Sequence, residues 1–118
     1  GLAFAPNGNL YAASVFTGRI GEFSPEGELV RMVVEPDSWF PPHATGTPQG
    51  LAVDSSGNLY YADLDIVWQE WMPGPGSNGR VWQVRMTPSG EPQTPEVLLE
   101  GLAFPDGLGI LTRPTDRE

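Results

Sequence analysis

The chain contains no cysteine, and its 6 lysine and arginine residues are far outnumbered by 15 aspartate and glutamate residues. The lack of cysteine excludes disulfides, thiolate metal sites and c-type haem attachment. The formal net charge of −9 at pH 7 argues against a nucleic-acid or anionic-membrane partner, because binding to phosphate depends on clusters of basic side chains. An acidic surface of this kind keeps a protein soluble and tolerates a bound cation.

Long apolar runs and helical periodicity are also missing. No segment approaches the roughly 20 apolar residues of a membrane-spanning helix, and no window shows the i, i+3, i+4 apolar spacing of an amphipathic helix. Glycine and proline are abundant instead, with 15 and 13 residues among 118, which indicates many short strands joined by turns. The chain starts at Gly1, inside a repeat, so we expect further sequence, an export signal included, to precede it.

One repeated segment organises the chain. The sequence GLAVDSSGNLYYAD at 50–63 is nearly repeated as GLAFAPNGNLYAA at 1–13, and it begins again as GLGIL at 107–111. Each copy is typical of an apolar strand, a tight turn that ends in glycine, and a second strand. The copies start about 49 and about 57 residues apart, a period that fits a four-stranded propeller blade and does not fit a helical solenoid.

The sequence therefore predicts an all-β fold, a β-propeller segment with two four-stranded blades and the inner strand of a third. The predicted parts are a blade at 1–35, a crossing loop at 36–49, a blade at 50–100, the start of a blade at 101–111 and a charged tail at 112–118. The predicted strands of the first blade are 1–4, 10–14, 19–23 and 28–34. Those of the second blade are 51–54, 59–63, 80–86 and 96–99.

An insertion of about 12 residues separates the second and third strands of the second blade, within 64–78. In an up-and-down blade this loop lies on the same face as the crossing between blades, so Trp68, Trp71 and His43 are predicted to share one rim. Two uses of the tryptophans stay open, namely a lid or sugar-stacking platform, and an interface with another surface. We interpret Asp63 and Asp65 beside them as solvated loop residues and not as metal ligands.

Three side chains are candidates for chemistry on that rim. Residues that precede the inner strands of successive blades converge on one axis, which predicts that Gln49 and Asp106 are neighbours and offer oxygen ligands to a hard cation such as Ca²⁺. The Pro-Asp-Gly segment around Asp106 is equally typical of a plain turn. His43, the only histidine, is a candidate proton shuttle at neutral pH, or else it is a loop residue bonded to backbone carbonyls.

At GLAVDSSGNLYYAD, and above all at Phe104-Pro105-Asp106-Gly107-Leu108, the chain resembles the six-bladed propellers of the gluconolactonase and senescence-marker-protein family (SMP-30), and more loosely the NHL-repeat propellers. The resemblance covers about a third of such a propeller. It implies a divalent metal in the central channel, held by a Glu, one or two Asn and an Asp. Asp106 matches that Asp, and Gln49 stands where the family has an Asn.

This resemblance implies a hydrolase of a small ester or lactone, in which Asp106 is a metal ligand and a candidate base. Alternatives from other classes are a non-catalytic NHL-type propeller that binds a protein or glycan through the tryptophan rim, and a quinone-dependent sugar-dehydrogenase-like propeller. The last is disfavoured because basic residues are sparse on the predicted rim. We expect two blades alone to be inactive, and to need the remaining blades or self-association through open sheet edges.

A ring built from three copies of this chain raises a specific conflict. A third-blade inner strand at 107–111 would compete for the same position as residues 1–4 of the next copy.

Overall fold

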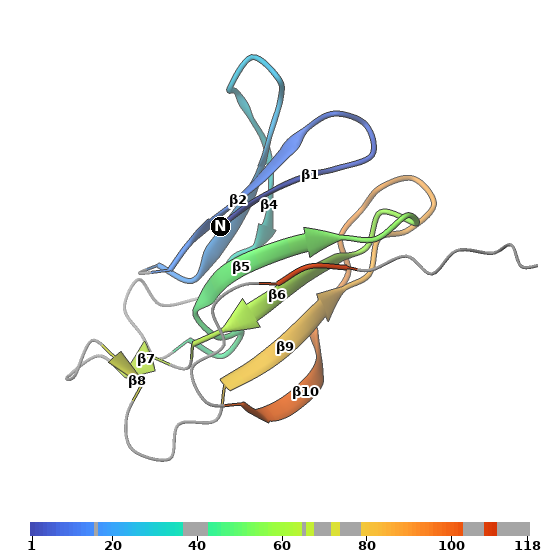
Figure 1. The fold of residues 1–118 in the computed structure, drawn as a ribbon. Helices are drawn as coiled ribbons and strands as arrows, with labels where there is room; N and C mark the ends of the chain where they lie inside the picture. Colours follow the sequence, from blue (N-terminus) through green and yellow to red (C-terminus); the bar gives the residue numbers. More distant parts are fainter. Residues whose placement is uncertain are drawn as a thin grey trace, which may run out of the picture.

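The computed structural model describes residues 1–15, 17–36, 43–64, 66–67, 72–73, 79–102 and 108–110. The secondary structure of these residues is all β, in two four-stranded antiparallel sheets and one two-stranded sheet (Figure 1). Within them no helix is long and apolar enough to cross a membrane. The predicted all-β class is thus confirmed.

The first four-stranded sheet, here called sheet A, follows chain order. Its strands are β1 (Leu2–Phe4), β2 (Leu10–Ser14), β3 (Arg19–Phe23) and β4 (Leu29–Val34), each antiparallel to the one before. The turn between β1 and β2 forms because Gly8 adopts a φ of 91° and donates its backbone N–H to the Ala5 carbonyl at 3.0 Å. Asn7 supports it, since its side chain accepts from the Asn9 amide.

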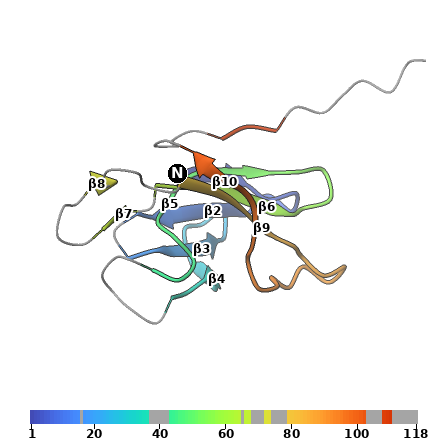
Figure 2. The same cartoon turned by 90° about the horizontal axis from the view of Figure 1, so that it is seen from below.

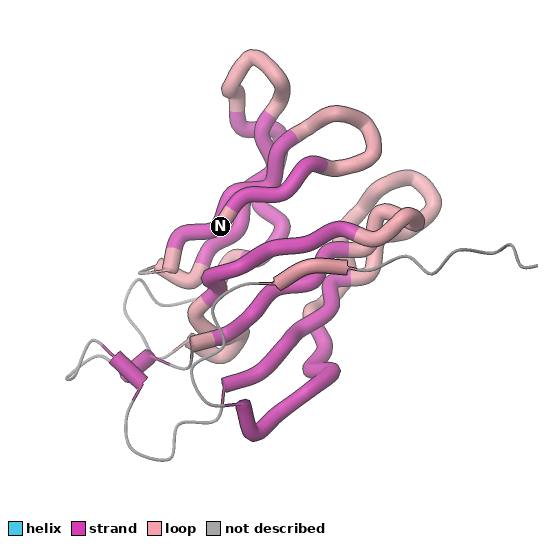
Figure 3. Tube along the Cα trace, in the orientation of Figure 1, coloured by secondary structure: helices cyan, strands magenta, loops and turns pink. Residues whose placement is uncertain are grey.

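The second sheet, sheet B, repeats this plan with the insertion between its second and third strands. Its strands are β5 (Pro48–Val53), β6 (Leu59–Asp63), β9 (Gly79–Val84) and β10 (Glu96–Leu102), in the spatial order β10-β9-β6-β5. Strands β7 (Ile66–Val67) and β8 (Met72–Pro73) form a separate pair inside the insertion (Figure 3).

Most predicted strands begin and end within two residues of their predicted bounds, and the larger differences are at β5, at β10 and at 107–111. Strand β5 begins at Pro48, inside the predicted crossing loop, and β10 extends to Leu102. Residues 108–110 are not in a strand, whereas the sequence predicts an inner strand at 107–111. A strand needs a neighbour for its backbone hydrogen bonds, and no strand of the described part pairs with these three residues.

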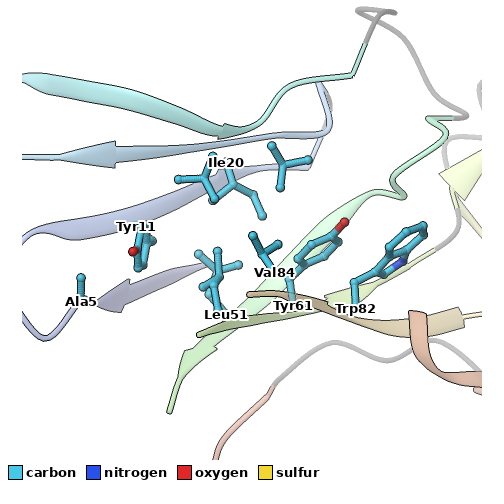
Figure 4. Packing of buried hydrophobic residues seen from close by; sticks show 10 residues of the cluster. Ala5, Tyr11, Ile20, Leu51, Tyr61, Trp82 and Val84 are labelled. Atoms are coloured by element: carbon cyan, nitrogen blue, oxygen red, sulfur yellow. The ribbon is translucent and has the colours of Figure 1, made fainter. Parts of the chain in front are cut away.

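Sheets A and B stack face to face, and the core lies between them (Figure 2). Tyr11 and Ile20 of sheet A meet Leu51, Tyr61 and Val84 of sheet B there (Figure 4), and each of them is at most 6% exposed. The edge strands β1 and β5 lie side by side and contact each other. Burial of apolar side chains from both sheets therefore stabilises their association.

The side chains that sheet A and sheet B direct into this interface come from different positions of the repeat, on opposite faces of the equivalent strands. Sheet A turns Ala3 and Tyr11 toward sheet B. Their counterparts about 49 residues later, Ala52 and Tyr60, pair on the face of sheet B that points away from sheet A, because the neighbouring Leu51 points into the core. The packing is therefore head to tail, with two different surfaces in contact.

Candidate functional site

The strands β1 and β5 begin at the same place. Gly1 lies so close to Gln49 that a Cβ at position 1 would collide with the Gln49 carbonyl oxygen. The carbonyl of Gly1 is fixed in turn, since it accepts from the Ala13 amide at 3.0 Å. Gln49, a predicted metal ligand, is half-buried at this junction. The structure thus places an amide side chain where the edge strands of two sheets start.

The loop at 43–47 leads into this junction, and it begins with a buried histidine. His43 is 5% exposed and packs against Gly18, where any Cβ would collide with the imidazole ring. Its carbonyl accepts from the Gly46 amide at 3.0 Å. The side chain is therefore enclosed between the loop and the turn that connects β2 to β3, and a role in proton transfer requires the loop to move.

Asp63, at the end of β6, fixes the loop from the other side. Its carboxylate is 0% exposed. One oxygen accepts from the Thr47 amide at 2.8 Å and from the Thr47 hydroxyl at 3.2 Å. The other accepts from Arg80 Nε at 3.0 Å and from Trp82 Nε1 at 2.9 Å, and it is 3.0 Å from Arg80 Nη2. A buried carboxylate that accepts from this many donors ties the loop, β6 and β9 together.

The structure corrects the interpretation of Asp63 as a solvated loop residue, whereas Asp65 lies outside the described residues. The missed signal was the period of two along β6. Leu59 and Tyr61 point into the core, so the side chain at position 63 must follow them to the same face. Arg80 lies directly opposite in the register of β9, which supplies the countercharge that burial requires.

Tyr61 adds a further contact to the same loop. Its hydroxyl donates to the Thr45 carbonyl at 2.7 Å, and its ring stacks on Trp82 with centroids 5.9 Å apart and planes 5° from parallel. Burial, and then the negative charge of Asp63, raise the pKa of the Tyr61 hydroxyl, which therefore stays protonated and remains a donor. The segment before Gln49 is thus held at Thr45 and at Thr47.

A groove with a volume of about 260 Å³ lies at the opposite end of the interface, between the hairpin turns. Glu22 lines it, and its carboxylate accepts from Asn9 Nδ2 at 2.7 Å and lies 3.3 Å from Arg31 Nε. Arg31 also donates to the Gly90 carbonyl at 3.2 Å, which joins sheet A to a turn of sheet B. Burial, and then Glu22, raise the pKa of Tyr11 in the same groove. These polar groups form hydrogen bonds and an ion pair with one another, and the bond from Arg31 to Gly90 holds the two sheets together at this groove.

Three predicted site residues, Asp106, Trp68 and Trp71, lie outside the described residues, and their places on the rim stay predictions. Among the residues that are described, no three histidine, aspartate or glutamate side chains gather as metal ligands do. Of the predicted metal ligands, Gln49 alone has a described position.

Comparison of the chain with protein-family models, with curated proteins and with solved structures found no match. The resemblance to the gluconolactonase and NHL propellers therefore depends on the repeat motif and the Pro-Asp-Gly segment alone.

Proposed function

We propose that this chain forms two adjacent blades of a six-bladed, gluconolactonase-like propeller that hydrolyses a small ester or lactone with the help of a bound divalent metal, most suitably Ca²⁺. The observation that supports this proposal is the junction of β1 and β5, where Gly1 meets Gln49. In a propeller the inner strands of neighbouring blades start side by side around the central channel, and β1 and β5 have this arrangement.

The repeat relates the two proposed ligands. Gln49 directly precedes Gly50, and Asp106 directly precedes Gly107, the corresponding glycine of the next repeat. If the third repeat starts where the first two meet, the Asp106 carboxylate lies beside the Gln49 amide. Both groups supply the oxygen ligands that Ca²⁺ prefers, and the net charge of −9 draws cations to the protein.

The described residues fit such a site through Gln49, whose half-buried side chain carries an amide oxygen. The hydrogen bonds of Thr47 to Asp63 fix the chain two residues before Gln49, so the backbone that leads to Gln49 is held in place before a ligand arrives. A bound Ca²⁺ would polarise the substrate carbonyl. Asp106 is the proposed second ligand and acceptor of the proton from the attacking water.

Calorimetric titration with Ca²⁺ tests the proposed site. We expect saturable binding by the wild-type chain, loss of binding in Asp106→Asn and weaker binding in Gln49→Ala. Glu26→Gln removes one negative charge from an exposed turn and is the matched control, which should bind as the wild type does. Binding that survives Asp106→Asn, or no binding by the wild type, would overturn the metal site.

Hydrolysis is tested separately with a small sugar lactone and a pH indicator. We expect no turnover from an isolated chain, and turnover that requires both Ca²⁺ and Asp106 once further blades complete the ring. Hydrolysis that is unaffected by a chelator would contradict the proposed chemistry.

A further inference from the structure

The outer face of sheet A, on the side away from sheet B, is apolar and uncovered. Leu2 is 68% exposed, Phe4 is 73% exposed and Leu29 is 56% exposed. Beside them lies a hollow of about 260 Å³. Small and apolar residues of β2, β3 and β4 make up much of its lining, namely Ala12, Gly21, Phe23 and Met32. Clusters of this kind on a sheet usually mark a contact surface.

The repeat shows what covers this face elsewhere in the same chain. The counterparts of Leu2 and Phe4, about 49 residues later, are Leu51 and Val53. Both pack against sheet A, with Leu51 only 6% exposed. The face that is bare in sheet A is therefore the face by which sheet B binds its neighbour.

The complementary surface is the outer face of sheet B, and it also carries an exposed apolar residue. Val81 of sheet B corresponds to Ile20 of sheet A in the repeat. Leu99 is the cross-strand partner of Val81, and Val34 is the cross-strand partner of Ile20, so Leu99 and Val34 occupy equivalent positions. Val34 is 3% exposed at the interface between the sheets, whereas Leu99 is 57% exposed. Residues 108–110 lie over part of this face (Figures 1 and 2), but they leave Leu99 accessible.

The outer faces of sheets A and B also match in size. Ala12 and Gly21 line the hollow of sheet A. The residues at the equivalent repeat positions in sheet B are Tyr61 and Trp82, whose rings stack. The residue offered by the other face is Leu99, which is larger than its counterpart Val34. A larger side chain on one surface thus meets a hollow on the other, as close packing requires.

We propose that the outer face of sheet A binds the outer face of sheet B of a second copy of this chain, head to tail, in the manner in which the two sheets already pack. An interface between two different surfaces repeats into a ring or an open chain of copies. Residues 108–110 are not in a strand but lie over part of the outer face of sheet B (Figures 1 and 2), so docking of the second copy requires them to move aside. The proposal shares its packing with the proposed propeller but needs neither metal nor hydrolysis.

Charge sets the conditions under which association is expected. Each copy carries a formal net charge of −9, so two copies repel each other at low ionic strength. Salt screens that repulsion and leaves apolar contacts intact. Head-to-tail docking should therefore become stronger as sodium chloride is raised, which is the opposite of an interface held by ion pairs.

Cysteine cross-linking tests the geometry directly, because the chain has no cysteine of its own. Phe4→Cys places a thiol on the outer face of sheet A, where Phe4 is 73% exposed, and Ala52→Cys places one on the outer face of sheet B, where Ala52 is 8% exposed. We expect covalent dimers when the two variants are mixed under mild oxidation, and several-fold fewer when either is oxidised alone. Leu99→Asp in the Ala52→Cys chain should reduce the yield several-fold, and Val30→Asp, at an exposed position in the irregular part of β4, should not.

Two results would overturn the proposal. Dimers of Phe4→Cys alone, formed as readily as in the mixture, would mean that two copies pair through identical faces. An absence of dimers in the mixture, with both thiols reactive and circular dichroism showing the native fold, would mean that this face binds no second copy. Neither result bears on Ca²⁺ binding by Asp106, which the titration measures separately.

Discussion

Replacing Asp63 with asparagine should destabilise the protein more than any surface charge change. The substitution keeps the shape and one acceptor oxygen, so the bonds from Thr47 can persist. It removes the charge that faces Arg80 and turns an amide donor toward Arg80 or Trp82, which are donors themselves. Breaking one partner of a buried ion pair costs about 3–5 kcal/mol. The Arg80 side chain is 23% exposed and regains some hydration, which favours the lower end, about 3 kcal/mol.

Urea unfolding followed by tryptophan fluorescence measures this loss. With a slope of about 1–3 kcal/mol per molar urea, a loss of about 3 kcal/mol lowers the midpoint by about 1–3 M. Glu26→Gln, in an exposed turn, is the control and should stay within about 0.5 kcal/mol of the wild type. The double variant Asp63→Asn, Arg80→Met should recover part of the loss, because it leaves no buried unpaired charge.

Amide hydrogen exchange gives a local readout of the same variant. The Thr47 amide should exchange faster relative to the strand amides of sheet A, since Asp63 accepts its hydrogen bond. A loss of stability below about 1 kcal/mol, with unchanged protection at Thr47, would refute the view that Asp63 holds the loop before Gln49.

Two further predictions concern single turns. Gly46→Ala should destabilise the protein by more than Gly8→Ala, because both glycines have positive φ, at 81° and 91°, but only at position 46 does the new Cβ collide with the Asp63 carboxylate. Thermal unfolding should show a loss of about 1–2 kcal/mol for Gly8→Ala from backbone strain alone. For Asp54, burial acts to raise the pKa, but hydrogen bonds from Tyr60 and from residues 56 and 58 outweigh it, and the pKa is lowered. The folded state therefore favours the charged form, and the stability that Asp54 contributes is present above the unfolded pKa of about 4 and is lost as the pH falls through the lower folded pKa. The difference in stability between wild type and Asp54→Asn should shrink below about pH 4 in urea titrations, and a difference that grows there would contradict this assignment.

The strands could be predicted because their signals are local. Asn7-Gly8 and Ser56-Gly57 mark turns, and alternating small and aromatic residues mark strands, so the starts of β2, β3 and β6 follow from neighbours in sequence. The face of each strand was harder to assign. Identical repeat positions lie inside the interface in sheet A and outside it in sheet B, and no local pattern distinguishes the two copies.

The site could be predicted less well because it depends on partners far along the chain. Asp63 is buried only because Arg80, 17 residues later, and Thr47, 16 residues earlier, provide its donors. His43 is enclosed because Gly18 has no side chain. Composition shows neither contact, and the roles proposed for Asp106, Trp68 and Trp71 still depend on sequence alone.

The head-to-tail interface between the two sheets is proposed to repeat between copies of the chain. Light scattering of the purified protein over a range of concentrations, at low and at high salt, measures this most directly. We expect a mass that rises from one chain toward whole multiples as concentration and salt increase, and that stays at one chain in Phe4→Asp. A wild-type mass of one chain at every concentration and salt would contradict it.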